Sequence, residues 1–184
     1  MAHNLENSIA VLERTPGALN AFLRGLPDVW THRNEGEGTF TVVDVTGHLI
    51  YADKSDWMPR ARKILAQSTT QATELPVFDP FDRWGHVDEC RGKTLPELLD
   101  EFVQIRSERV KELRALNLAP GQLALRGRHP ALGEVTLSEL LATWAAHDLT
   151  HLHQISRIMA HQCRDEVGPF SAFLGVLKCN GHGG

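Results

Sequence analysis

The sequence predicts an all-α protein, a four-helix bundle with one long crossover connection. Two observations support this prediction: apolar residues recur at intervals of three and four through four long segments, and no run has the continuous apolar character of a buried parallel strand. With 184 residues, 42% of them apolar, the chain is long enough for one domain with its own core. We therefore assign residues 1–179 to a single domain and residues 180–184 to a flexible tail.

The first two helices are defined by their apolar spacing and by their prolines. Apolar side chains recur at helical intervals from Leu5 to Leu26, and Pro16 is expected to kink or restart this helix, because proline lacks the amide hydrogen of a helix interior. The second helix follows Thr41, which opens the capping sequence Thr-Val-Val-Asp, and it is expected to bend at Pro59.

The second half of the chain is predicted to hold a long loop and two further helices. Residues 75–93 contain prolines and aromatics without any period, which predicts a structured loop. Capping sequences at Thr94 and Thr136 open the third and fourth helices. Residues 123–135 alternate briefly around a Gly/Pro turn, which predicts a small hairpin or an irregular loop before the fourth helix. Residues 170–179 are predicted to form a short additional C-terminal helix.

Composition excludes several kinds of partner. The 19 basic and 23 acidic residues give a net charge of −4 without a dense run of Lys or Arg, so no nucleic acid partner is expected. The longest uncharged apolar stretch is far shorter than the ~20 residues of a membrane span, so no membrane association is expected. The N-terminus lacks a secretion signal, and Cys90, Cys163 and Cys179 have no C-x-x-C spacing, which fits reduced thiols in a cytoplasmic protein.

Three histidines form a candidate metal site. His147 and His151 are four positions apart in the fourth helix, which places both imidazoles on one face about 6 Å apart along the axis. Leu140 and Trp144 share this face, so the pair is expected to point into the bundle. His48 lies on a core-facing stripe of the second helix. Three neutral imidazoles from two helices would hold Zn²⁺, Ni²⁺ or Fe²⁺ and leave a coordination position for water or substrate.

These histidines also have a simpler interpretation. His48 alone could be a hydrogen-bonded core residue, and an H-x-x-x-H pair arises by chance in a chain with 10 histidines. The helical turn directs His153 away from the pair, and His161 lies too far along the helix, by ~21 Å, to join it. His86 and His129 fall in loops, where solvent exposure is expected, although His86 could line a pocket mouth.

The sequence from His147 to His151 is close to the H-E-x-x-H motif of zinc proteases. Here Asp148 replaces the glutamate that acts as general base, and no third ligand follows on a later helix, so a protease is disfavoured. Asp148 projects about 100° from its histidine neighbour. We therefore interpret Asp148 as a carboxylate that either supports the ligands or lies at the helix surface.

Two segments resemble signature blocks of the DinB-like (YfiT-like) metal-binding four-helix bundles: TFTVVDVTGHLIYAD in the second helix and VTLSELLATWAAHDLTHLHQISRIM in the fourth. The resemblance extends to the LERTPGALNAFLRGLP opening and to the start of the third helix, GKTLPELLDEF. It implies an up-down-down-up bundle that pairs as a homodimer and binds a divalent metal through His48, His147 and His151. Some relatives are thiol transferases or isomerases that use a low-molecular-weight thiol.

Three functions are compatible with these features, and no catalytic residue is assigned. The first is metal-dependent transfer of a small thiol to an electrophilic substrate, with Tyr51 and Gln154 as hydrogen-bond donors near the ligands. The second is a metal-dependent hydrolase, in which the cation activates water. The third is a non-catalytic, stress-related module in which the metal is structural or sensed.

Overall fold

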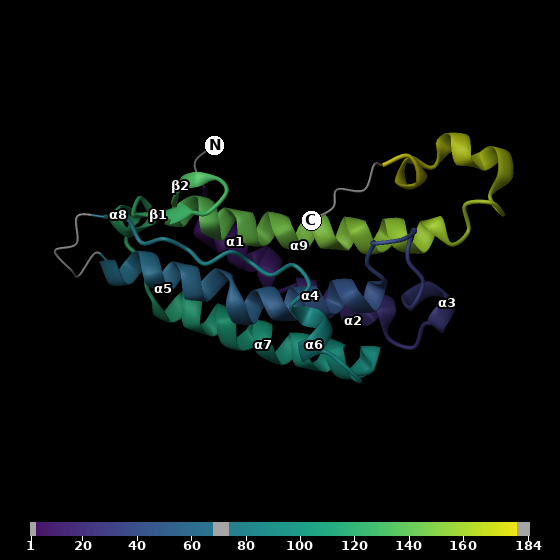
Figure 1. Ribbon diagram of the computed structural model, residues 1–184, viewed down its shortest axis with the longest axis horizontal. Coiled ribbons are helices and arrows are strands. Elements are labelled where there is room, and N and C mark those ends of the chain that lie inside the picture. The colour runs from purple at the N-terminus through teal and green to yellow at the C-terminus, as the bar shows by residue number, and fades with distance from the viewer. Residues whose placement is uncertain (1–2, 68–73, 180–184) are drawn as a thin grey trace.

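The computed structural model describes residues 3–67 and 74–179, and the tail expected at 180–184 lies outside the described residues. Four long helical segments form the bundle, and short helices and a hairpin connect them (Figure 1). The long segments are α1 (Leu5–Leu12) with α2 (Thr15–Leu23), α4 (Val42–Ser55) with α5 (Trp57–Gln67), α7 (Leu95–Ala115) and α9 (Leu137–His161). The short elements are α3 (Asp28–Thr31), α6 (His86–Glu89), α8 (Pro120–Leu123), β1 (Arg126–His129) and β2 (Gly133–Thr136).

The helices have the predicted up-down-down-up order. Figure 1 shows α4 and α5 running in the same direction as α7, while α1, α2 and α9 run the opposite way. The crossover between α5 and α6 returns along the length of the bundle, as the two parallel helices require. Capping boxes at Thr41, Thr94 and Thr136 confirm the three predicted helix starts, in each case with an acidic side chain accepting from the threonine N–H.

Two of the long segments are interrupted near proline. Residues 13 and 14 separate α1 from α2, and Pro16 lies in the first turn of α2, where its missing N–H has no helical partner to lose. The second interruption is at Asp56, between α4 and α5, one turn before Pro59. A proline ring clashes with the carbonyl four residues earlier, so the helix breaks ahead of the proline rather than at it.

The connections confirm one prediction and correct another. Residues 126–136 form the expected hairpin, with Arg126 opposite Thr136 and His129 opposite Gly133. The C-terminal segment forms two short 3-10 helices, Gly168–Phe173 and Gly175–Leu177, instead of one amphipathic α-helix. Phe170 and Phe173 are 70% and 87% exposed, so this segment has no buried apolar face to stabilise an α-helix. Within the described chain, no helix combines the length and apolar character that crossing a bilayer requires.

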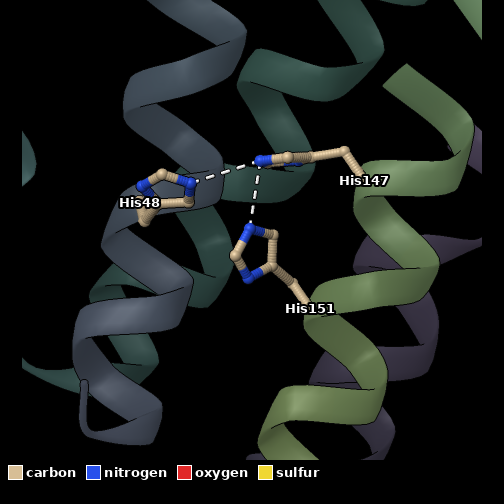
Figure 2. Close-up of side chains that lie close together, drawn as sticks. All are labelled: His48, His147 and His151. Carbon is tan, nitrogen blue, oxygen red and sulfur yellow. Dashed lines mark hydrogen bonds between the residues drawn. The ribbon is translucent and has the colours of Figure 1, made fainter. Parts of the chain in front are cut away.

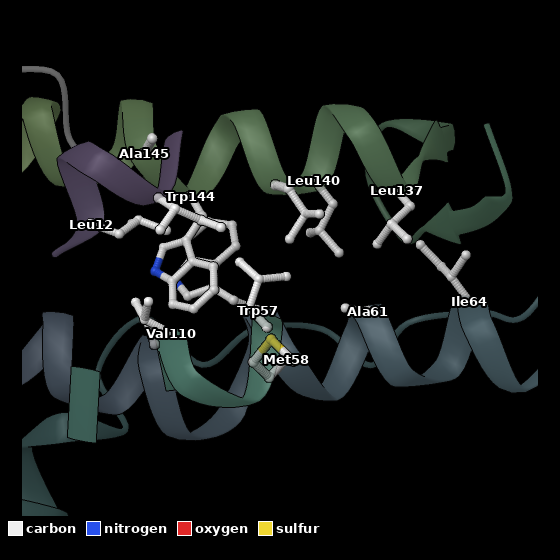
Figure 3. Close-up of a cluster of buried hydrophobic side chains, with 14 of the residues drawn as sticks. Leu12, Trp57, Met58, Ala61, Ile64, Val110, Leu137, Leu140, Trp144 and Ala145 are labelled. Atoms are coloured by element: carbon white, nitrogen blue, oxygen red, sulfur yellow. The ribbon is translucent and has the colours of Figure 1, made fainter. Parts of the chain in front are cut away.

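Two apolar clusters fill the bundle, and a polar layer lies between them. One cluster packs α1, α5 and the first half of α9, including Trp57 and Trp144 (Figure 3). The other packs α2, α4, the start of α7 and the end of α9. Along α7, Arg106 separates Phe102 of the second cluster from Val110 of the first. Buried polar side chains of α4 and α9 occupy this same layer, where ion pairing and hydrogen bonding must offset their desolvation.

Candidate metal centre

Three histidine rings converge between α4 and α9. The Nε2 atom of His147 lies 3.2 Å from Nε2 of His48 and 3.0 Å from Nε2 of His151 (Figure 2). One ligand atom from each ring lies within 4.8 Å of the others. The structure therefore brings together the three residues that the sequence predicts as ligands, including two that are separated by 99 positions.

Hydrogen bonding around the rings favours a cation at their centre. The Oε1 atom of Gln154 lies 2.7 Å from Nδ1 of His151 and accepts its proton, which leaves a lone pair on Nε2. A single N–H on His147 is directed at only one neighbouring Nε2 at a time, whereas a cation accepts all three lone pairs. The buried Nδ1 atoms of His48 and His147 have no hydrogen-bond partner among the described residues, so each is free to carry the proton of a neutral ring.

All three rings are held in the neutral form that metal ligation requires. Burial and the neighbouring histidines together lower the pKa of His48 to about 3, and burial has the larger effect. Burial lowers the pKa of His147 to about 2. The pKa of His151 is also lowered by burial, against the opposing effects of Gln154 and Asp148.

We expect these neutral rings to make the metal-free protein sensitive to acid. A histidine that is neutral in the folded protein but binds a proton near pH 6.5 in the unfolded chain makes its full contribution to the free energy of unfolding above that pH. Its contribution is lost as the pH falls below about 6.5. Urea unfolding should show that the free energy of unfolding falls between pH 7.5 and pH 5.5 by about 1.4 kcal/mol more in the wild type than in His48→Gln.

The comparison with a variant is needed because other groups titrate in the same range. Burial raises the pKa values of Asp53 and Asp56 to about 6, and a raised carboxyl pKa increases stability as the pH falls. The exposed His153 provides the matched control, and His153→Gln should keep the wild-type pH dependence. Equal slopes in wild type and His48→Gln would show that His48 is not held neutral.

Asp148 does not lie at the helix surface, which excludes one of its two interpretations, and its charge acts to raise the pKa of His151. It is fully buried and forms a two-point ion pair with Arg106, which also pairs through Nε with Asp53 at 2.7 Å. The Leu12 carbonyl accepts a further bond from Arg106 at 3.1 Å, so all five guanidinium N–H donors are used. Trp144 donates to Asp53 at 3.0 Å.

This polar layer supports the histidine cluster through two tryptophans. Trp144, fixed by its bond to Asp53, stacks on Trp57 with ring centroids 6.1 Å apart. Trp57 in turn packs edge-on against His147 at 5.1 Å. The orientation of His147 is therefore set by packing as well as by its backbone position.

Of the two side chains predicted to donate hydrogen bonds near the ligands, one contacts a histidine and the other does not. Gln154 contacts His151, but as an acceptor rather than the expected donor. Tyr51 is half-buried and packs on Phe81 with ring centroids 5.5 Å apart, and no hydrogen bond joins it to the three histidines within residues 3–67 and 74–179. The absence of a side chain at Gly85 makes room for it, since a Cβ there would lie 2.4 Å from the Tyr51 ring.

The prediction of solvent exposure is wrong for His86. This residue is 1% exposed, because α6 packs on α4 and places its ring 5.0 Å from that of Phe40. His129 is half-buried and lines a pocket beside the histidine cluster. His153 is exposed and outside the cluster, as expected, and His161 is half-buried away from it.

A model of the DinB superfamily matches residues 11–155. The chain belongs to the DinB superfamily. Among solved structures, its fold is similar to that of YfiT from Bacillus subtilis, with a TM-score of 0.69, 21% identity, and coverage of 88% of this chain and 87% of that one. YfiT is described as "a probable metal-dependent hydrolase with an unusual four-helix bundle topology". At this identity the similarity establishes the fold alone. No curated protein matches the chain.

In this DinB-superfamily member the histidine cluster borders a pocket of about 280 Å³. His48 and His147 contribute to its wall. Most of the remaining lining is apolar and comes from α5, the crossover, the hairpin and α9: Trp57, Phe78, Phe81, Leu132, Val135 and Leu140. A small concave site with a mostly apolar surface and several polar groups is typical of small-molecule binding.

The hairpin closes one side of this pocket through a glycine. Phe78 donates its backbone N–H to the Arg128 carbonyl at 2.9 Å, so the crossover pairs with β1. The ring of Phe78 then lies against Gly127, where a Cβ would be 2.5 Å from the ring. Glycine is therefore required at residue 127 for this close approach.

Proposed function

We propose that this protein is a divalent-metal-dependent hydrolase of a small molecule that binds in the pocket beside the histidines. The observation that carries the proposal is the convergence of three neutral imidazoles from two helices, two of which, His48 and His147, line that pocket. His48, His147 and His151 would hold the ion, since neutral nitrogen ligands suit Zn²⁺, Ni²⁺ and Fe²⁺. Three protein ligands are also the usual number in catalytic zinc sites, whereas structural sites use four.

When bound, the metal would supply Lewis-acid activation of water and of the substrate carbonyl. The protein's own residues provide the surroundings. The aromatic rings of Trp57, Phe78 and Phe81 bind the apolar part of a substrate and exclude bulk water. Gln154 keeps His151 in the required tautomer. The description of YfiT as a probable metal-dependent hydrolase is consistent with this class of reaction.

Transfer of a small thiol is the second candidate, and one observation favours it. Three neutral ligands leave the charge of a divalent ion uncompensated, which favours an anionic ligand such as a thiolate. Among the described residues no cysteine lines the pocket, so the sulfur would come from a low-molecular-weight thiol. In such a transfer the S–C bond forms as the bond to the leaving group breaks, and the thiol proton is released to solvent.

One set of assays distinguishes these candidates. Protein loaded with Zn²⁺, Ni²⁺ or Fe²⁺ is tested against a panel of aryl esters and amides, and separately against a small thiol with an alkyl halide. Hydrolysis that is lost on chelation and in His48→Ala supports the hydrolase. A rate that is unchanged by chelation would overturn both candidates.

The Co²⁺-substituted protein gives an independent readout of thiol binding. A sulfur-to-metal charge-transfer band on adding the thiol would support transfer. The measurement belongs in a variant with Cys90, Cys163 and Cys179 replaced by serine, so that no protein thiol contributes. If several thiols give no charge-transfer band and no transfer, thiol transfer is removed as a candidate and hydrolysis remains.

We also propose that the chain forms a homodimer. Phe22 on α2 and Val103 on α7 are 47% and 45% exposed, and these two helices pack against each other. Exposed apolar side chains of this kind are consistent with a self-association surface. Light scattering at micromolar concentration should give twice the 20.5 kDa chain mass. A monomer mass would contradict the proposal.

A further inference from the structure

Arg83 is a cation without an anionic partner, within the described part of the chain, at the wall of the histidine pocket. It follows Phe81 in the crossover and lines the same pocket as His48 and His147. Its Nε atom is buried and has no hydrogen-bond partner, and within residues 3–67 and 74–179 no carboxylate pairs with its guanidinium. A half-buried arginine in this state has lost part of its hydration without an ion pair to offset that loss.

The position of Arg83 is fixed by its neighbours. The guanidinium carbon lies 5.0 Å from the ring centre of Phe40 and 5.8 Å from that of Trp84. The backbone carbonyl of Arg83 lies 3.2 Å from Nδ1 of the buried His86. Stacking on aromatic rings uses the faces of a guanidinium and leaves the N–H donors at its edges for another partner.

The other charged side chains of the pocket already have hydrogen-bonding or ionic partners. Arg60 pairs with Asp56 at 2.6 Å and also donates to the Asp79 carbonyl at 3.2 Å. The Glu139 carboxylate caps α9 by accepting from the N–H of Thr136 at 2.7 Å. Among the described residues, Arg83 is thus the pocket cation that lacks a counterion, and its charge reaches the cluster, where it helps to lower the pKa of both His48 and His151.

We propose that this pocket binds an organic carboxylate whose anionic group pairs with Arg83 and whose apolar body lies on the aromatic lining. This inference rests on the proposed function for the claim that such a molecule is the substrate. The fork of a guanidinium matches a carboxylate in two parallel hydrogen bonds. One unpaired cation and a mostly apolar lining suit a monoanion better than a phosphate dianion, which would need further donors.

The test compares phenylacetate with its neutral isostere phenylacetamide by calorimetry on metal-free protein at pH 7.5. The three histidines are then neutral, so a preference for the anion reports on arginine rather than on metal or imidazolium. We expect phenylacetate to bind about tenfold more tightly than phenylacetamide, as a charge-assisted pair provides. In Arg83→Gln this ratio should fall to about one, and in Arg83→Lys it should be intermediate.

Arg91→Gln is the matched control, because Arg91 follows α6 shortly after Arg83 in the sequence and forms an exposed ion pair with Asp88. It should keep the wild-type ratio. If Arg83→Gln does not fold, Arg83→Met retains the apolar stem against Phe40 and gives the same readout. A ratio near one in the wild type, or a preference that survives removal of the guanidinium, would overturn the proposal.

The metal-loaded protein separates this proposal from the proposed function. If the protein binds no metal or shows no metal-dependent turnover while the metal-free preference for phenylacetate holds, only the proposed function fails. If metal-dependent ester hydrolysis is found without that preference, only the carboxylate assignment fails.

Discussion

Replacing His147 with alanine should reduce bound metal from about one ion per chain to less than a tenth of that amount after dialysis. The reason is geometric, since His147 is the ring whose Nε2 approaches both of the others. Removal of one of three ligands leaves two imidazoles, which is fewer than zinc sites in proteins use. Elemental analysis of protein purified without a histidine tag provides the measurement. His48→Ala and His151→Ala should lose metal to a similar extent.

Two further variants make this result specific. His153→Ala removes an exposed imidazole from the same helix and should retain full occupancy. Gln154→Ala removes the acceptor that orients His151 and should weaken metal affinity about 10- to 100-fold without abolishing it. Equal retention in all variants would show that the metal, if bound, lies elsewhere.

Arg106→Met should destabilise the fold more than substitution of any of the three histidines. The arginine is 1% exposed and is the counterion of both Asp53 and Asp148. Its removal leaves two carboxylates buried without a positive charge, which typically costs about 3–5 kcal/mol. Urea unfolding at pH 7 measures the difference in the free energy of unfolding.

The pH dependence and a matched variant identify the cause of that loss. Burial already raises the pKa of Asp53, and removal of the guanidinium raises it further, so Arg106→Met should regain stability as the pH falls and be least stable above the raised pKa. Arg114→Met is the control on the same helix, because Arg114 is 44% exposed and pairs at the surface with Glu6 and Glu13. It should cost less than about 1 kcal/mol. A similar loss in the free energy of unfolding for both variants would refute the role of Arg106 as the counterion of the two buried carboxylates.

The helices and the histidine cluster could be predicted because both depend on local periodicity. The threonine capping boxes mark three helix starts, and the four-residue spacing places His147 and His151 on one face. His48 is identifiable by its position on an apolar stripe. That these segments lie side by side follows from the bundle, in which each apolar face must be covered by another.

The rest of the site depends on tertiary contacts that periodicity does not encode. His86 is buried and Arg83 lines the pocket because the crossover folds back on α4, and neither residue lies in a periodic segment. Arg106 does leave a readable signal, because it occupies a core position on the stripe between Phe102 and Val110. A charge on an apolar stripe indicates a buried partner, and here the partners are Asp53 and Asp148, the second of which the sequence alone could also have placed at the helix surface.

The contact between Gly127 and Phe78 bears on how readily the pocket could change its selectivity. The shape of one wall depends on the absence of a single methyl group on the hairpin, far in sequence from His48. Alanine at residue 127 would force the aromatic ring to move, while the helices that carry the ligands stay in place. One wall of the pocket can therefore be reshaped by a one-carbon change at a residue that is not one of the three histidines, so evolution or an engineer could alter the pocket there without replacing a ligand.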